Sequence, residues 1–324
     1  MCTAMAYQTK DHYFGRNLDL DCSYGETVTV TPRHYLFAFR QAPAMPRHYA
    51  IIGMAHLAGG YPLYYDATNE AGLSMAGLNF PGNAVYRPAA RGKDNVTPFE
   101  LIPWILGQCA SLGEARRLLD RLNLLDLAFR PDMPLAPLHW MLSDKTGCLV
   151  VEPLAGGLAV ADNPAQVLTN NPPFAYQRTN LSNYLNLTPR EPENRFAQGI
   201  RLETYCKGMG AMGLPGDMSS VSRFVRGAFV RLNAVSGAGE EESVAQFFHL
   251  LGAVSQPRGC VRLDNGGYEL TVYSSCCNAT RGIYYYTTYE NSRLSAVDMH
   301  RVDLEGNRPV SYPLTRGLQV DWQN

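Results

Sequence analysis

The chain begins Met1-Cys2-Thr3-Ala4-Met5-Ala6-Tyr7-Gln8 and, after a short polar stretch, continues Tyr13-Phe14-Gly15-Arg16-Asn17-Leu18-Asp19. Both stretches are short and largely apolar, and polar residues bound them, which is typical of adjacent β-strands. We therefore predict strands at Cys2–Gln8 and Tyr13–Leu18. The pattern continues to residue 80 without helical periodicity, and it predicts further strands at Thr27–Thr31, Leu36–Arg40, Ala50–Gly53 and Leu73–Leu78.

Helical periodicity is found in two later parts of the chain, where apolar residues recur at helical spacing with charged residues between them. We predict helices at Pro98–Cys109, Leu112–Leu122, Val221–Asn233 and Glu242–Val254, and strands at Leu138–Ser143, Cys148–Pro153, Leu158–Ala161, Tyr268–Ser275, Gly282–Tyr289 and Ser295–Asp298. Groups of antiparallel strands separated by helical pairs predict an α+β protein whose sheets are covered by helices. No repeat, linker or charge block divides the chain, so we predict a single domain over residues 1–324.

The composition is that of a globular protein, with 324 residues, 46% hydrophobic and 18% charged, and a formal net charge of -1. Basic residues are spread along the chain, which argues against a nucleic-acid partner. No uncharged apolar run reaches the roughly 18 residues of a membrane span. The N-terminus lacks the basic and apolar regions of a secretory signal. We therefore expect a cytoplasmic protein that does not insert into membranes.

Familiar cofactor and metal motifs give no signal. The run Gly208-Met209-Gly210-Ala211-Met212-Gly213 matches a dinucleotide fingerprint, but the following Leu214-Pro215-Gly216 cannot continue the helix that such a site requires. We interpret it as a loop. Cysteines form no C-x-x-C pair and the histidines are scattered, so we expect no metal and no cofactor.

The position of Cys2 is the unusual feature among eight cysteines. Removal of Met1 would leave a first residue that carries both a thiol and a free α-amine. An α-amine has an ordinary pKa of about 8 and a thiol of about 8.5, so the amine can accept the thiol proton near neutral pH. Position alone does not distinguish this nucleophile from a chance cysteine. The remaining cysteines we interpret as free packing residues.

Two charges on the next predicted strand bear on this choice. A cationic Arg16 would favour a nearby thiolate, and an anionic Asp19 could hold an α-ammonium. Their three-residue spacing places them on opposite faces of a regular strand, so a bend near Asn17 is needed if both are to meet Cys2. The alternative is a surface ion pair.

Six ordered motifs give the chain a resemblance to the choloylglycine hydrolase family, which includes bile salt hydrolases and penicillin V acylases. They are Met1-Cys2-Thr3, Phe14-Gly15-Arg16-Asn17-Leu18-Asp19, Ala76-Gly77-Leu78-Asn79-Phe80-Pro81, Leu168-Thr169-Asn170-Asn171-Pro172, Leu214-Pro215-Gly216-Asp217 and Ser222-Arg223-Phe224, and the likeness extends through Gly282–Asn291. The resemblance implies an N-terminal-nucleophile hydrolase with a four-layer αββα sandwich and a homotetrameric assembly.

The resemblance also implies roles for individual residues. Cys2 corresponds to the family's nucleophile, with its own α-amine as the base. Arg16 and Asp19 correspond to the pair beside it, and Arg223 to the second arginine of the site. Asn170 corresponds to a side-chain donor to the oxyanion, with the backbone N–H of Asn79 as the second donor.

The implied substrate is a bile salt conjugated with glycine or taurine, cleaved at the C–N amide bond through a thioester, with aminoacyl transfer as a side activity. Asn79 matches the bile salt hydrolases, because penicillin V acylases carry Tyr there. We predict an apolar substrate wall from Leu18, Leu20, Phe129 and Met133, although these residues would equally suit a core. The alternatives are a penicillin V or N-acyl-homoserine-lactone acylase, and a redox sensor that uses Cys2 as a reactive thiol.

Overall fold

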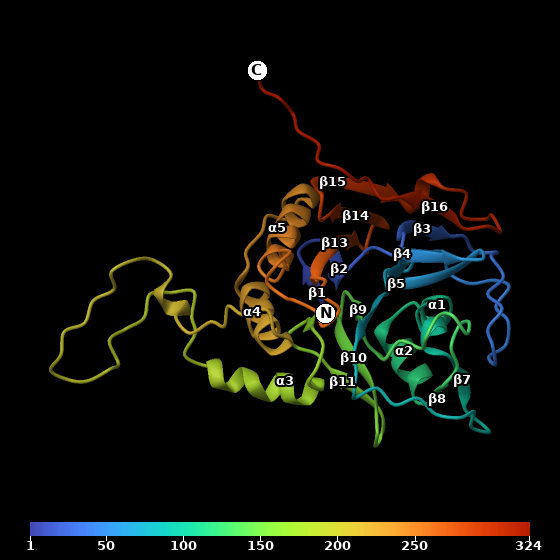
Figure 1. Cartoon of the computed structure of the whole chain (residues 1–324), viewed down its shortest axis with the longest axis horizontal. Helices are drawn as coiled ribbons and strands as arrows, with labels where there is room; N and C mark the ends of the chain where they lie inside the picture. Colours follow the sequence, from blue (N-terminus) through green and yellow to red (C-terminus); the bar gives the residue numbers. More distant parts are fainter.

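Two large β-sheets lie face to face between helices in the computed structural model, which describes residues 1–324 (Figure 1). The first sheet has six strands in the order β12-β1-β2-β13-β14-β15, all paired antiparallel. These strands are β1 (Cys2–Gln8), β2 (His12–Leu20), β12 (Val167–Leu168), β13 (Leu270–Asn278), β14 (Ile283–Thr288) and β15 (Asn291–Asp298).

The second sheet has eight strands in the order β11-β10-β9-β6-β5-β4-β3-β16, again antiparallel throughout. They are β3 (Thr27–Thr31), β4 (Ile51–Ala58), β5 (Tyr61–Asn69), β6 (Ser74–Asn79), β9 (Leu138–Asp144), β10 (Gly147–Leu154), β11 (Gly157–Asp162) and β16 (Val310–Pro313). A small parallel pair, β7 (Asp94–Val96) and β8 (Leu122–Leu124), lies beside it.

Helices cover the outer face of each sheet. Helices α1 (Leu101–Leu106) and α2 (Leu112–Leu119) pack on the eight-stranded sheet, and α4 (Ser220–Asn233) and α5 (Glu240–Gly252) pack on the six-stranded sheet. The short α3 (Phe174–Asn180) contacts α4. The predicted α+β class and four-layer order are therefore confirmed. No helix is both long and apolar enough to cross a membrane.

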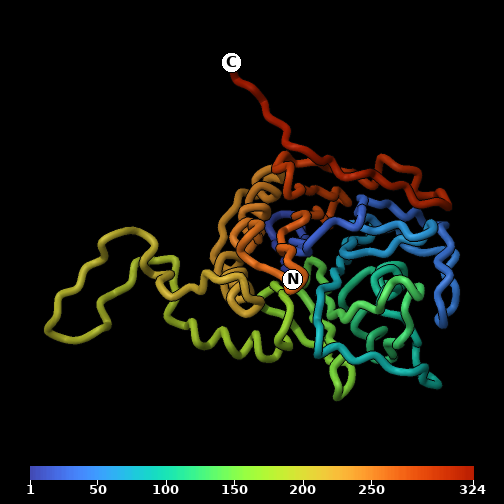
Figure 2. The backbone as a smooth tube through the Cα atoms, in the orientation of Figure 1, coloured from blue at the N-terminus to red at the C-terminus, as the bar shows by residue number.

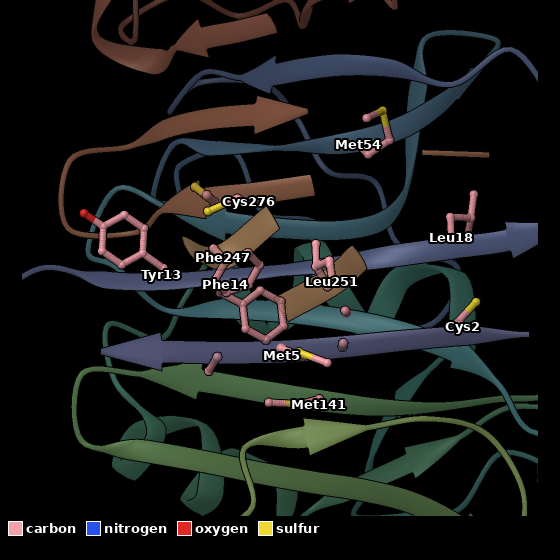
Figure 3. Packing of buried hydrophobic residues seen from close by; sticks show 14 of the residues in the cluster. Cys2, Met5, Tyr13, Phe14, Leu18, Met54, Met141, Phe247, Leu251 and Cys276 are labelled. Carbon is pink, nitrogen blue, oxygen red and sulfur yellow. The ribbon is translucent and has the colours of Figure 1, made fainter. Parts of the chain in front are cut away.

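The β1–β2 hairpin occupies the middle of the sandwich. Its register runs from Gln8 opposite His12, beside the turn, to Cys2 opposite Leu18 at the open end. Nearly every residue of both strands is buried because the second sheet lies on one side and α4 and α5 lie on the other. Gly15 is required here, since a Cβ would collide with the Ser275 carbonyl of β13. Cys2 thus lies at one end of a strand within the core (Figure 3).

Most predicted elements are present with shifted ends. One predicted strand is absent, and the elements that were not predicted are β5, α3 and the short strands β7, β8, β12 and β16. Leu36–Arg40 is not a strand, because it forms only an isolated bridge between Phe37 and Met45, and the Phe37 ring packs in an aromatic cluster. Strand β5 was not predicted, because Gly59, Gly60 and Pro62 interrupt the apolar pattern at the β4–β5 turn. Helix α3 was not predicted either.

Two segments extend away from the layers (Figure 2). Residues 185–212 form a long excursion between α3 and α4, and residues 317–324 form the C-terminal tail. The glycine-rich run at 208–213 lies in the excursion and forms a single 3-10 turn at Met209–Ala211. No strand precedes it and no helix opens on it, so its interpretation as a loop is confirmed.

His12 lies at the closed end of the hairpin, where its ring nitrogens contact Ser143 Oγ at 2.9 Å and Gln8 Oε1 at 3.0 Å. Burial lowers the pKa of His12 to about 4. Between pH 6.5 and 4 the unfolded chain therefore binds a proton that the folded chain does not, and the folded state loses about 3 kcal/mol as the pH falls. Urea unfolding at pH 7 and pH 4 should show this loss in the wild type and a smaller one in His12→Gln. Equal losses of unfolding free energy in the wild type and in His12→Gln would contradict the attribution of this pH dependence to His12.

Candidate active site

Cys2 is 3% exposed, and polar groups hold its main chain from both sides. Its N–H donates to Asn170 Oδ1 at 2.7 Å, and its carbonyl accepts from Arg223 Nη1 at 2.6 Å. By register, the Cys2 side chain points to the same face of the hairpin as Arg16, toward the eight-stranded sheet. The thiol therefore shares its environment with a guanidinium.

Arg16 is fully buried and reaches across to the second sheet. Its Nη1 donates to the carbonyls of Gly77 at 2.6 Å and Tyr65 at 3.0 Å, whereas its Nη2 has no partner. A buried cation beside a thiol favours the thiolate. Arg16 thus joins β2 to strands β5 and β6.

Asp19 points to the opposite face, toward the helices. Thr271 Oγ1 donates to its carboxylate at 2.6 Å and Gln256 Nε2 at 3.3 Å, with Arg223 Nη1 at 3.9 Å. Burial raises the pKa of Asp19, and the Arg223 charge opposes this. Arg16 lies on the face of the hairpin toward which the Cys2 thiol points, and Asp19 lies on the opposite face, near the Arg223 that holds the Cys2 main chain. The strand therefore needs no bend at Asn17.

Arg223 is the fourth residue of α4, which begins after the N-cap Ser219. Its guanidinium is fully buried and donates to Cys2 O, Thr3 Oγ1, Asn170 Oδ1 and Met218 O at 2.6 to 3.1 Å. It therefore connects the nucleophile's strand, the Asn170 loop and the start of α4.

The N-terminal ammonium of Met1 is held by the Asp19 carbonyl at 2.8 Å and forms an ion pair with Glu269. Burial lowers the pKa of this Met1 amine. The base in the expected chemistry is a different group, the Cys2 α-amine that removal of Met1 would leave. Glu269, which is 6% exposed, pairs with this Met1 ammonium, and the charge of Asp19 acts on it as well. The expected contact of Asp19 with the Cys2 α-amine stays a prediction. Glu269 was missed because it directly precedes β13 with no motif around it.

Asn170 is the junction between Cys2 and Asn79. Its Oδ1 accepts from both Cys2 and Arg223, which orients the amide so that Nδ2 donates to the Asn79 carbonyl at 2.7 Å. Asn79 ends β6 and is exposed. The structure therefore brings together all six residues for which the sequence suggested a catalytic role: Cys2, Arg16, Asp19, Asn79, Asn170 and Arg223.

A largely apolar cavity of about 600 Å³ lies on the other side of the Arg16 contacts. Tyr65 and Gly77, whose carbonyls bind Arg16, line it. Phe129 and Met133 line it as well. Leu18 and Leu20 do not, because Leu18 is in the core and Leu20 packs against that core.

The remaining cysteines and His139 are more ordinary. All eight cysteines are free, and Cys109, Cys148, Cys276 and Cys277 are buried, as packing residues would be. That interpretation is wrong for Cys22, Cys206 and Cys260, which are exposed because they lie in loops.

His139 is a core residue whose two ring nitrogens both have hydrogen-bond partners, on Glu152 and Thr169, and its ring stacks on Phe80. No cluster of three or more His, Cys, Asp or Glu is arranged to hold a metal ion.

A buried N-terminal thiol between two arginines, next to an amide donor, is suited to nucleophilic attack on an acyl group. The family model described as "Linear amide C-N hydrolases, choloylglycine hydrolase family" matches residues 2–312. The chain belongs to the choloylglycine hydrolase family.

Relatives within the choloylglycine hydrolase family match along their whole length. A protein named bile salt hydrolase/transferase from Lactiplantibacillus plantarum is 50% identical over 98% of both chains. Another of that name from Clostridium perfringens is 36% identical over 100% of both. The crystal structure of the C2A mutant of conjugated bile acid hydrolase from Clostridium perfringens superposes with a TM-score of 0.92, 36% identity and full coverage of both chains. Penicillin V acylase from Agrobacterium tumefaciens shares the fold, at TM-score 0.77 and 21% identity over 97% of this chain and 92% of that one.

Replacing Arg223 by Lys should destabilise this family member markedly, because one ammonium cannot span the acceptors on Cys2, Thr3 and Asn170 and leaves Asp19 poorly paired. We expect a loss of about 3 kcal/mol in the free energy of unfolding, measured in urea. Arg226→Lys is the matched control, since Arg226 lies on the same helix, is only partly buried and bonds carbonyls away from Cys2. Equal losses in the two variants would contradict this account of Arg223.

Proposed function

We propose that this chain hydrolyses the C–N amide bond of bile salts conjugated with glycine or taurine. One observation carries the proposal: Cys2 is buried beside Arg16, and Arg16 bonds the floor of the apolar cavity of about 600 Å³. A cavity of this size and lining suits a steroid acyl group. We place the acyl group in this cavity and the scissile carbonyl at Cys2.

The reaction starts once Met1 is removed and Cys2 carries the α-amine. The amine takes the thiol proton, and the thiolate attacks the amide carbonyl carbon. Arg16 favours the thiolate from the side-chain face. Asp19 and Arg223 hold the main chain from the other face, so that the nucleophile and its base stay in one geometry.

The tetrahedral intermediate places negative charge on the former carbonyl oxygen. The Asn170 side-chain N–H and the backbone N–H of Asn79 are the proposed donors to this oxygen. The C–N bond breaks as the α-ammonium gives its proton to the leaving amine, and a thioester remains. Water, deprotonated by the same amine, then attacks the thioester carbonyl and releases the bile acid and the Cys2 thiol.

Two further points support a bile salt as the acyl donor. The relatives with the highest identities above are named for bile salts. By the family resemblance, Asn79 matches the bile salt hydrolases. Phe129 and Met133 are proposed to contact the steroid, as lining residues of the cavity.

Aminoacyl transfer is the second activity that we propose. A thioester that water can attack is open to an amine as well, and the amine then forms a new amide as Cys2 leaves. The related proteins from Lactiplantibacillus plantarum and Clostridium perfringens are named hydrolase/transferase, which favours this activity here.

We also propose that the chain forms a homotetramer through the excursion at 185–212. Large apolar side chains are exposed along it: Leu185, Phe196, Ile200, Leu202, Tyr205 and Met212. Such a patch is costly in a monomer and is typical of an interface. A cytoplasmic location remains a prediction from the sequence.

The first test concerns the nucleophile. Intact mass should show that the active protein lacks Met1, and Cys2→Ser should reduce glycocholate and taurocholate hydrolysis by at least about a thousandfold, because a hydroxyl is far less acidic than a thiol. Amine release is measured for both conjugates and for penicillin V.

An active protein that retains Met1 would contradict the mechanism. A tenfold or greater preference for penicillin V would instead contradict the substrate. Circular dichroism of Cys2→Ser is the control, since this substitution should leave the fold unchanged.

The second test concerns assembly. Sedimentation velocity should give a tetramer for the wild type and smaller species for Phe196→Asp combined with Tyr205→Asp, because both side chains are 80% exposed in the monomer. Tyr176→Asp, outside the excursion, is the control. A monomeric wild type at micromolar concentration would contradict the proposal.

A further inference from the structure

A buried carboxylate, Asp66 on β5, links the two sheets beneath the thiol face of the hairpin. It is 1% exposed. The hydroxyls of Tyr273 and Tyr284 each donate to it at 2.6 Å, and Ser275 Oγ donates at 3.3 Å. All three donors come from β13 and β14 of the opposite sheet, so this acid is held in place by the packing of one sheet on the other.

Asp66 is connected to Arg16 by two routes. The Arg16 backbone N–H donates to Ser275 Oγ at 3.2 Å, and Ser275 in turn donates to Asp66. Arg16 Nη1 also donates to the carbonyl of Tyr65, the residue before Asp66. Burial raises the pKa of Asp66, and the charge of Arg16 is the largest influence that opposes it.

The charges around Cys2 fall into two sets. On the helix face Arg223 is balanced by Asp19, and Glu269 pairs with the ammonium of Met1 while that residue is present. On the thiol face Arg16 has no carboxylate within ion-pair distance, and its Nη2 is buried without a partner. A buried cation needs a compensating charge nearby. The titratable and charged groups around Cys2 thus form two sets. On the thiol side they are Arg16, Asp66, Tyr273 and Tyr284, and on the helix side they are Asp19, Glu269, Arg223 and the Met1 amine.

We propose that Asp66, held by Tyr273 and Tyr284, is a positioning residue that keeps Arg16 in place and limits how strongly Arg16 favours the Cys2 thiolate. The inference rests on the proposed role of Cys2 as nucleophile. Without the carboxylate, the field of Arg16 at the thiol is uncompensated. The thiolate then forms at lower pH, and the Arg16 main chain loses its link to Asp66 through Ser275.

The experiment measures Cys2 alkylation by iodoacetamide from pH 4 to 10 in the processed full chain, with peptide mass spectrometry to follow Cys2 alone. In Asp66→Asn the midpoint of the rate profile should fall by roughly one pH unit, the order of shift that one nearby unit charge causes. Asp66→Glu keeps the negative charge, so its midpoint should lie between those of Asp66→Asn and the wild type. Asp144→Asn is the matched control, because Asp144 is a buried acid at the closed end of the hairpin, and its midpoint should equal that of the wild type.

If Asp66→Asn does not fold, Tyr273→Phe combined with Tyr284→Phe decides the question. Loss of both donors makes ionised Asp66 less favourable, so the midpoint should move in the same direction by a smaller amount. An unchanged midpoint in the folded variant used would overturn the proposal. Glycocholate hydrolysis, measured in parallel, tests the proposed function separately, because alkylation needs no bile salt.

Discussion

Burial of charge at the open end of the β1–β2 hairpin is the constraint on which the site depends. Arg16 and Arg223 are both fully buried, and burial of a guanidinium is costly unless acceptors and nearby charges compensate it. Arg223 finds them on Cys2, Thr3 and Asn170, and Arg16 finds them on β5 and β6. These acceptors are in place only when α4 and both sheets are packed. Folding and assembly of the site are therefore one event.

The two faces of the β1–β2 hairpin carry different charged groups of the site. Paired residues point the same way and alternate residues share a face. Cys2, two residues from the Ala4 that pairs with Arg16, therefore faces the second sheet with Arg16, while Asp19 faces the helices. The thiol is thus influenced by a cation on one face, and the main chain that carries it is held from the other. This separation lets two arginines act near one sulfur without meeting each other.

The order of elements could be predicted because strand and helix patterns are local. The strands of the hairpin and helices α2, α4 and α5 follow from apolar spacing, and the four-layer order followed from resemblance. The strand predicted at Leu36–Arg40 was wrong, because Phe37 packs in an aromatic cluster and the segment forms only one isolated β-bridge. The exposed Cys22, Cys206 and Cys260 were misassigned because a cysteine's burial depends on where its loop lies.

The six proposed catalytic residues were identified from ordered motifs, but the contacts that define their roles were not. Asp66 and Glu269 carry no motif, and each meets the site through residues far away in the sequence. The sequence by itself determined the nucleophile, the strand that carries it and the family. Only the tertiary structure decided which carboxylate faces which cation, and which of the four predicted apolar residues line the cavity. Burial and pairing of charge arise between strands of different sheets, so no local pattern encodes them.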